Sequence, residues 1–241
     1  MKLAVASSAF HRILESGELT QLEFLDLCAR DLACDGVVLD VRHFPRTDGD
    51  YLAQVKKMAA DRGLGIAAVA DAGFFAGDET AMRSSLERAG ALGAPLLAAP
   101  LPLETSGPWI EQLERLGTAT SLAKRANVTL ALRNAPGTFA ATAHDCKRVS
   151  KETDSAWLRF GLDPLALDTA SDPAALAPNA VLLWSDLDAG ASAIASALAT
   201  FAAFRGYLAL DGRDGSASAA EMQSAMRSWR IALAEKELNR T

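Results

Sequence analysis

Arginine, aspartate and histidine side chains follow several short apolar runs of this sequence, at points where a strand would end and a loop begin. An aspartate can move a proton next to a carbonyl group, and an arginine can stabilise the negative charge that forms there. The candidate catalytic residues are Arg133, Asp163 and Asp211. The candidate substrate-binding residues are His11, Arg42, His43 and Asn134.

The elements that must position these residues are eight short apolar runs with helical segments between them. The runs recur at intervals of about 20–35 residues, the rhythm of repeated βα units. They are Leu3–Ala6, Val37–Asp40, Ile66–Ala70, Leu96–Pro100, Val128–Leu132, Leu158–Leu162, Val181–Trp184 and Tyr207–Leu210. No linker or charge block divides the chain, so the sequence predicts one α/β domain over residues 1–241, a single (β/α)8 TIM barrel. In this fold the active site lies at the C-terminal ends of the strands, where the candidate residues stand.

Signals for the starts and ends of helices support this pattern. Thr20–Glu23 and Ser218–Glu221 each match a capping box, in which a hydroxyl and a carboxylate satisfy backbone N–H groups at a helix start. Gly63 follows Arg62 where a helix is expected to stop, as a glycine in a left-handed C-cap would.

Alternation along the strands predicts which side chains face the barrel interior. If Arg133 points inward, Thr129 and Ala131 do so too, and Leu130 and Leu132 face the helices. The inward set predicted for the other strands is Ala4, Ala6, Gly161, Asp163, Ala209 and Asp211. Small inward residues leave room for polar groups at the top of the barrel. The tryptophans have no spacing typical of a ligand cage and are interpreted as core or interface residues: Trp109, Trp157, Trp184 and Trp229.

Each candidate catalytic residue also has a structural interpretation. Arg133 either binds an anionic group of a ligand or forms a salt bridge with the protein's own carboxylates. Asp163 precedes Pro164, and Asp-Pro commonly opens a turn. Asp211 begins the polar segment Asp211–Gly215, which is also typical of a turn.

The candidate binding residues have similar alternatives. Arg42 and His43, with the following Phe44, offer two cations and an aromatic wall for a sugar or small acid, but His43 can instead cap backbone groups in a loop. His11 either orients a ligand or plugs the barrel rim. Asn134 either bonds a ligand hydroxyl or holds the turn that follows it.

Composition restricts the partners. The net charge of −6 and the pI of about 5.1 give no basic surface for nucleic acid or an anionic membrane, so neither is expected as a partner. The expected partner is the small sugar or organic acid that Arg42, His43 and Phe44 would suit. Cys28, Cys34 and Cys146 have no paired spacing and are interpreted as reduced core thiols of a cytoplasmic protein. No signal-peptide pattern is recognised, and Ala189–Phe204 is too short and too rich in Ala and Ser for a membrane span. A homo-oligomer is left open.

The whole chain resembles the xylose isomerase-like TIM barrels, the sugar phosphate isomerase/epimerase group. The matching stretches are Lys2–His11 (KLAVASSAFH), Gly36–Pro45 (GVVLDVRHFP), Arg62–Ala68 (RGLGIAA), Leu92–Pro95 (LGAP), Val128–Pro136 (VTLALRNAP) and Phe160–Pro164 (FGLDP). The resemblance implies a divalent metal such as Mn²⁺ or Mg²⁺ at the barrel top, held by Glu, Asp, His and Glu from the fifth to eighth strands. It also implies a glutamate that moves a proton between adjacent carbons.

Most of the implied ligands are missing from this sequence. Arg133 stands at the first Glu position, while Asp163 and Asp211 stand at the Asp and last Glu positions. No histidine lies near Leu183–Ser185, and Val38 replaces a glutamate frequent in the second strand. A guanidinium cannot lose its proton and repels a divalent ion. We therefore expect that the metal site is lost, that no cofactor is present, and that Arg133 bridges Asp163 and Asp211.

The sequence thus predicts a sugar or sugar-phosphate isomerase/epimerase-like protein acting on a small polyhydroxy or keto-acid ligand, with a degenerate metal site. Without metal, Asp163 or Asp211 would carry the proton and Arg133 would stabilise an enediolate. The alternative is a non-catalytic barrel that binds a small anionic ligand, so the sequence leaves catalysis undecided. A DNA-repair endonuclease of the same superfamily is disfavoured, because three histidines and an acidic composition do not supply its multi-metal site.

Overall fold

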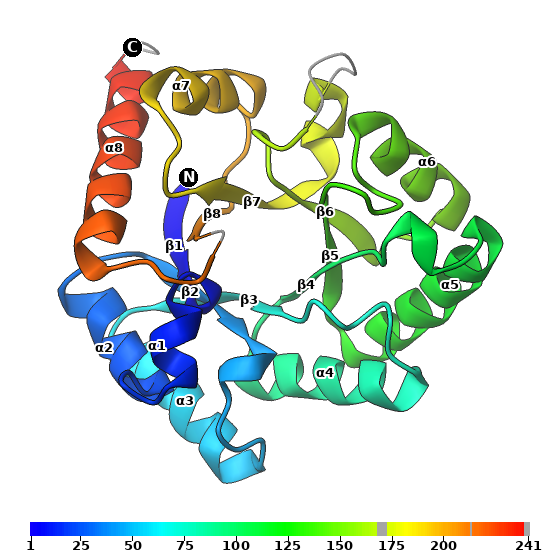
Figure 1. Cartoon of the computed structure of the whole chain (residues 1–241), viewed down its shortest axis with the longest axis horizontal. Helices are drawn as coiled ribbons and strands as arrows, with labels where there is room; N and C mark the ends of the chain where they lie inside the picture. The colour runs from blue at the N-terminus through cyan, green and yellow to red at the C-terminus, as the bar shows by residue number, and fades with distance from the viewer. Residues whose placement is uncertain (168–172, 213, 239–241) are drawn as a thin grey trace.

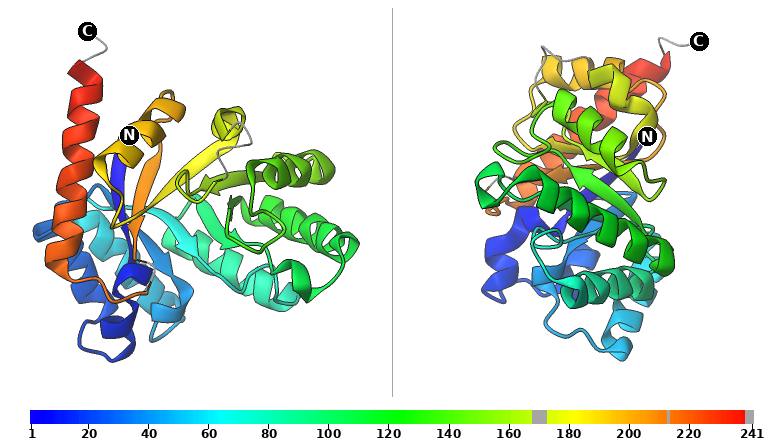
Figure 2. Two further views of the ribbon diagram at one scale, coloured as in Figure 1. Left: turned by 45° about the horizontal axis from the view of Figure 1, so that its top comes forward. Right: turned by 90° about the vertical axis from the view of Figure 1, so that its right-hand side faces the viewer.

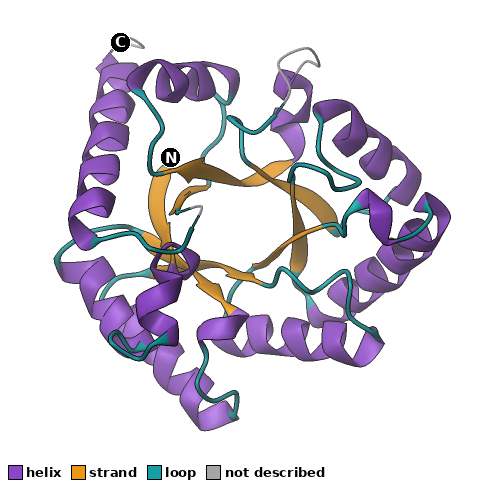
Figure 3. Ribbon diagram, viewed as in Figure 1, coloured by secondary structure: helices purple, strands orange, loops and turns teal. Residues whose placement is uncertain are grey.

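The computed structural model describes residues 1–167, 173–212 and 214–238. Eight parallel strands pair in chain order and close into a barrel, which confirms the predicted (β/α)8 fold (Figure 1). The strands are β1 Lys2–Ala6, β2 Gly36–Asp40, β3 Gly65–Ala70, β4 Leu96–Pro100, β5 Thr129–Arg133, β6 Leu158–Leu162, β7 Ala180–Asp186 and β8 Tyr207–Asp211. The α-helices are α1 His11–Glu15, α2 Gln21–Arg30, α3 Gly49–Asp61, α4 Glu79–Leu92, α5 Trp109–Ala126, α6 Ala143–Thr153, α7 Ala191–Thr200 and α8 Ala219–Leu238. The helices surround the strands, as Figures 2 and 3 show from several sides.

The predicted strand boundaries differ from the observed ones by up to two residues. The fifth strand begins at Thr129 rather than Val128 and includes Arg133. Asn127 adopts a left-handed conformation that ends α5, and the Val128 N–H therefore bonds the Ala123 carbonyl instead of a neighbouring strand. The helix cap thus uses the first residue of the predicted strand.

The predicted helix signals have the expected geometry. Thr20 and Glu23 form the capping box of α2, with the Glu23 N–H on the Thr20 hydroxyl and the Thr20 N–H on the Glu23 carboxylate. Ser218 and Glu221 make the same reciprocal pair before α8. Gly63 has a φ of 71°, the left-handed conformation expected after α3.

Segment Ala189–Phe204 forms α7 over Ala191–Thr200, and this helix buries Ile194, Ala197 and Leu198 against the barrel. In the described ranges, no helix combines the length and the apolar character needed to cross a membrane.

The three cysteines are free and buried, in agreement with their interpretation as core thiols. The Cys34 thiol donates to the carbonyls of Cys28 and Gly36 at 3.4 and 3.2 Å. Burial raises the pKa of Cys146 to about 12, so this thiol stays protonated and unreactive at neutral pH.

The barrel interior follows the predicted alternation. Ala131 and Ala209 lie in the inner cluster of side chains, whereas Leu130 and Leu132 pack in the outer layer against the helices. The inner cluster also contains Ala4, Ala6, Val38, Ala68, Ala98, Leu182 and Trp184. The inward-facing side chains are therefore small on most strands. β7 is the exception, because its inward residues Leu182 and Trp184 are large.

Tyr207 closes the N-terminal end of the barrel. Its side chain lies against Gly36 and Gly65: a Cβ at Gly36 would come within 2.7 Å of the ring, and one at Gly65 would overlap the tyrosine hydroxyl. A side chain at either position would therefore force Tyr207 to move.

Candidate active site

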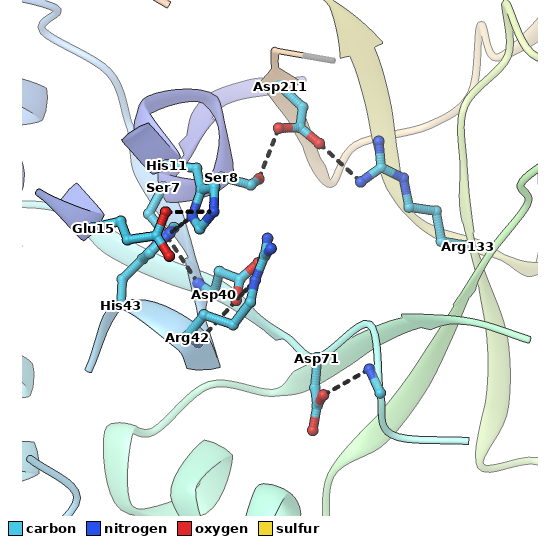
Figure 4. A network of polar contacts seen from close by, with 11 residues as sticks. Ser7, Ser8, His11, Glu15, Asp40, Arg42, His43, Asp71, Arg133 and Asp211 are labelled. Atoms are coloured by element: carbon cyan, nitrogen blue, oxygen red, sulfur yellow. Dashed lines mark hydrogen bonds and ion pairs between the residues drawn. The ribbon is translucent and has the colours of Figure 1, made fainter. Parts of the chain in front are cut away.

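A pocket of about 680 Å³ lies at the C-terminal ends of the strands. Its polar lining comes mainly from the ends of β1, β2, β5, β6 and β8, and part of this network is drawn in Figure 4. Six of the seven predicted site residues line the pocket: His11, Arg42, Arg133, Asn134, Asp163 and Asp211.

Arg133 is the last residue of β5, and the strand alternation turns it into the barrel. Its Nη1 donates to Oδ2 of Asp211 at 2.8 Å, and the Ser8 hydroxyl donates to Oδ1 of the same carboxylate at 2.7 Å (Figure 4). The guanidinium carbon lies 4.0 Å from the centre of the Trp184 ring. An ion pair and a cation–π contact therefore hold this arginine in place.

Asp163 follows β6, and Asn134 fixes its backbone. The Asn134 Oδ1 accepts the Asp163 N–H at 2.7 Å, and Nδ2 donates to the Asp163 carbonyl at 3.1 Å. The Asp163 Oδ1 accepts N–H groups of Leu165 and Ala166 at 3.0 and 3.2 Å, which is the turn expected for Asp-Pro. Burial raises the pKa of the Asp163 carboxyl, while these bonds and the charge of Arg133 oppose the rise. A pocket carboxyl with a raised pKa is a candidate for proton transfer.

A chain of hydrogen bonds leads from the interior to the surface near β1. The Asp40 N–H donates to the Ser7 hydroxyl at 2.9 Å. This hydroxyl lies 2.8 Å from Nδ1 of His43. The His43 Nε2 lies 2.9 Å from Nδ1 of His11, and the His11 Nε2 lies 3.4 Å from the exposed Glu15 carboxylate (Figure 4). Burial lowers the pKa of His43, so its ring is neutral at physiological pH.

Arg42 is held by Asp40, the last residue of β2. The Asp40 carboxylate accepts the Arg42 backbone N–H, Nε and Nη2 at 2.9, 3.0 and 2.7 Å. This hydrogen-bonded pair raises the pKa of Arg42 further. The guanidinium side chain is half-exposed and reaches the pocket.

A family model for the xylose isomerase-like TIM barrel matches residues 28–230. The chain belongs to the xylose isomerase-like TIM barrel family. This match confirms the resemblance expected from the sequence, and it agrees with the closed barrel of the structure. No curated protein matches the sequence significantly.

Solved structures with this fold share little sequence with the chain. L-ribulose 3-epimerase is 17% identical with a TM-score of 0.74, and the match covers 100% of this chain and 98% of the epimerase. D-psicose 3-epimerase from Clostridium cellulolyticum H10 is 15% identical with a TM-score of 0.71, over 99% of both chains. The probable 3-DHS dehydratase AsbF of Bacillus anthracis, involved in petrobactin synthesis, is 13% identical with a TM-score of 0.72, over 94% of this chain and 98% of the dehydratase. These similarities establish the shared fold.

The residues at the barrel top do not fit the metal that the family resemblance implies. Both oxygens of Asp211 already accept hydrogen bonds, and one of these comes from the permanent cation of Arg133. Val38 is buried among apolar side chains of the barrel interior. Within the described ranges, no three His, Cys, Asp or Glu residues converge as metal ligands.

We predict that Mn²⁺ titration of the protein gives no stoichiometric binding, because Arg133 repels the ion from Asp163 and Asp211. Isothermal titration calorimetry measures this directly. Arg133→Glu, which replaces the cation by a carboxylate, is the matched variant and is expected to bind Mn²⁺ more tightly. Tight binding by the wild-type protein at one site, lost in Asp163→Asn, would contradict the prediction.

The structure brings together only part of the predicted bridge. Arg133 bonds Asp211, but no described hydrogen bond joins it to Asp163, whose Oδ1 accepts two backbone N–H groups. His43 is 7% exposed and lies behind His11 rather than in the pocket lining. Asn134 holds the Asp163 backbone, a role that neither of its predicted alternatives included.

Sequence reasoning missed Trp184 as a residue of the site. Trp184, interpreted as core or interface, is buried but lines the pocket under Arg133. In the register of β7 and β8, Trp184 pairs with Ala209 and Asp186 pairs with Asp211. Trp184 therefore faces the same side of the sheet as Ala209 and Asp211. Parity would therefore have placed it inside, as it did for the neighbouring strands.

Proposed function

We propose that this protein binds a small polyhydroxy or keto-acid ligand in the barrel-top pocket and catalyses an isomerase- or epimerase-type proton transfer. The observation that carries the proposal is that one pocket holds both a fixed cation and a carboxyl suited to proton transfer. Arg133 is a cation held in place by Asp211, and Asp163 is a carboxyl with a raised pKa close enough to sense the charge of Arg133. The family membership and the epimerase neighbours support the reaction class.

The proposed chemistry needs a carbonyl with a hydrogen on the adjacent carbon. The Asp163 carboxylate takes that proton as the C–H bond breaks, and the electron pair becomes an enolate, or an enediolate where that carbon carries a hydroxyl. Arg133 donates hydrogen bonds to the developing negative oxygen. In an isomerisation the adjacent hydroxyl proton passes to that oxygen while Asp163 returns its proton to the former carbonyl carbon, so the carbonyl forms on the carbon that lost the C–H bond. Asp211 and Ser8 are positioning residues in this scheme, because the Asp211 carboxylate is bonded to Arg133 and Ser8 and holds the guanidinium.

Solvent exchange tests the proposal. Chelator-treated protein is incubated in D₂O with D-ribulose or hydroxypyruvate, and loss of the ¹H signal next to the carbonyl is followed by NMR. We expect exchange with the wild-type protein and a loss of about 100-fold in Arg133→Gln, because one preorganised charged donor contributes on that scale. Exchange that depends on added Mn²⁺ would contradict the metal-independent scheme.

The second candidate is a non-catalytic barrel that binds a small anionic ligand. The observation that favours it is the Arg133–Asp211 ion pair at 2.8 Å, which joins residues standing at two of the metal-ligand positions implied by the family resemblance. Ligand binding without any deuterium exchange, and with equal affinity in the wild type and Asp163→Asn, would support this candidate instead.

A further inference from the structure

We infer that the pocket selects a ligand rich in hydrogen-bond acceptors, a 2-oxo monocarboxylate with an apolar side chain, over a polyol or a phosphate ester. The inference rests on the proposed function, since it names the substrate class of the same site. It follows from the hydrogen-bonding capacity that the protein leaves unused in the pocket.

The pocket aspartates are largely occupied by the protein's own donors. The two oxygens of Asp40 accept from Arg42, and those of Asp211 accept from Ser8 and Arg133. The two oxygens of Asp214 accept from the backbone and the hydroxyl of Ser216. Ligand hydroxyls must donate as well as accept, and each of these six oxygens already accepts at least one hydrogen bond from the protein. Of the four lining aspartates, Asp163 alone keeps an oxygen, Oδ2, without a donor among the described residues.

Donors, by contrast, remain available. Arg133 uses one of its five N–H groups on a described residue, namely on Asp211. Arg42 uses two side-chain N–H groups on Asp40, and its guanidinium is 52% exposed. Carbonyl and carboxylate oxygens are the natural partners of such groups.

The hydrogen-bond chain behind the pocket adds a further donor at His11. Because the Asp40 N–H already donates to Ser7, the Ser7 hydroxyl hydrogen is free to point to Nδ1 of His43. A neutral His43 then donates from Nε2 to Nδ1 of His11, which leaves the His11 hydrogen on Nε2. That N–H faces the exposed Glu15 carboxylate at 3.4 Å, so a ligand oxygen would have to displace Glu15 to accept from it. With the hydrogens placed this way, each donor in this series, from the Asp40 N–H to His11 Nε2, has an acceptor.

The charge balance argues against a phosphate. The described lining has four aspartates against two arginines, and each of these arginines is paired with an aspartate. A dianion would meet no uncompensated positive charge from these side chains. A monocarboxylate can share the remaining N–H groups of one arginine at a smaller electrostatic cost.

An apolar wall completes the selection. Small apolar residues line the pocket at the ends of β3 and β4 and in the loops after β5 and β6, among them Ala70, Ala98, Pro100, Ala135 and Ala166. These side chains offer a ligand contact area without hydrogen bonds, which suits an aliphatic group and disfavours a chain of hydroxyls.

The test compares matched probes by isothermal titration calorimetry on the full chain. The probes are 4-methyl-2-oxopentanoate, its reduced form 2-hydroxy-4-methylpentanoate, xylitol and ribulose 5-phosphate. The first two differ only in whether C2 carries a carbonyl or a hydroxyl. We expect the oxo acid to bind at least about tenfold more tightly than each of the others, the scale of one hydrogen bond to a charged group. Its affinity should fall about tenfold or more in Arg133→Gln, and His11→Ala should narrow the gap between the oxo acid and the hydroxy acid.

Tighter, Arg133-dependent binding of xylitol or ribulose 5-phosphate overturns this inference and leaves the proposed function standing. Absence of binding by all four probes also overturns it. The proposed function is judged separately, by deuterium exchange into D-ribulose and hydroxypyruvate, so failure of the two can be told apart.

Discussion

Asp163→Asn is expected to lower proton exchange at the substrate carbon by about 10²–10⁴-fold while leaving the protein as stable as the wild type, or more stable, at pH 7. The asparagine Oδ1 can still accept the N–H groups of Leu165 and Ala166, so the turn is kept. The neutral amide also avoids the cost of burying a charge, which is what raises the pKa of Asp163. Loss of function without loss of stability distinguishes a catalytic carboxylate from a structural one.

The pH dependence has a defined sign. Because the pKa of Asp163 is raised in the folded protein, the folded state binds this proton more tightly than the unfolded state does. The stability that the protonated carboxyl contributes is present below its ordinary pKa of 3.8 and is lost as pH rises through the raised value. Denaturation at a series of pH values should therefore show that the unfolding free energy of Asp163→Asn rises relative to that of the wild type across this pH window. Above the window the difference should stay constant. Exchange by the wild type should rise over the same window, since the carboxylate is the base.

Asp214→Asn is the matched control, because Asp214 also lines the pocket but is exposed. Hydrogen bonds from Ser216 lower the pKa of Asp214, the opposite of the shift at Asp163. We expect this variant to keep proton exchange. A strongly destabilised Asp163→Asn, or one that exchanges at the wild-type rate, would remove Asp163 from the proposed mechanism.

Much of the barrel could be predicted because its rules are local. The alternation of Arg133 with Ala131 and Leu132 requires only the period of a strand, and the capping box of Thr20 and Glu23 requires only one helical turn. Parity in two strands was enough to bring Arg133 and Asp211 to the same end of the barrel, where the ion pair is found.

The rest of the site depends on contacts that no local pattern encodes. Of the two inward aspartates, Arg133 bonds Asp211, while Oδ1 of Asp163 accepts two backbone N–H groups in its turn. His43 bonds His11 and Ser7, which precede it in the sequence by 32 and 36 positions. These bonds depend on how the loops after β1 and β2 approach each other. Such side-chain geometry follows from tertiary packing, which spacing in the sequence does not specify.

Trp184→Ala is expected to cost about 3–5 kcal/mol of unfolding free energy, the range for truncation of a large buried aromatic side chain. The indole lies inside the barrel, where it is 1% exposed and packs beside Gly161, at which a Cβ would come within 3.1 Å of the indole nitrogen. Removal of the ring leaves a cavity that a closed sheet cannot easily collapse into. Urea denaturation measures this loss directly.

Trp184→Phe separates packing from the polar edge of the indole. The buried indole N–H has no hydrogen-bond partner among the described residues, so replacement by a phenyl ring sacrifices no described bond and keeps an aromatic face under Arg133. We expect Trp184→Phe to lose less stability than Trp184→Ala and to keep most of its ligand affinity. In Trp184→Ala the guanidinium loses the ring that fixes its plane, and only the Asp211 bond remains to orient it. Ligand affinity should therefore fall in Trp184→Ala even under conditions where the variant is fully folded. Equal affinity in all three proteins would mean that the Asp211 ion pair alone positions Arg133.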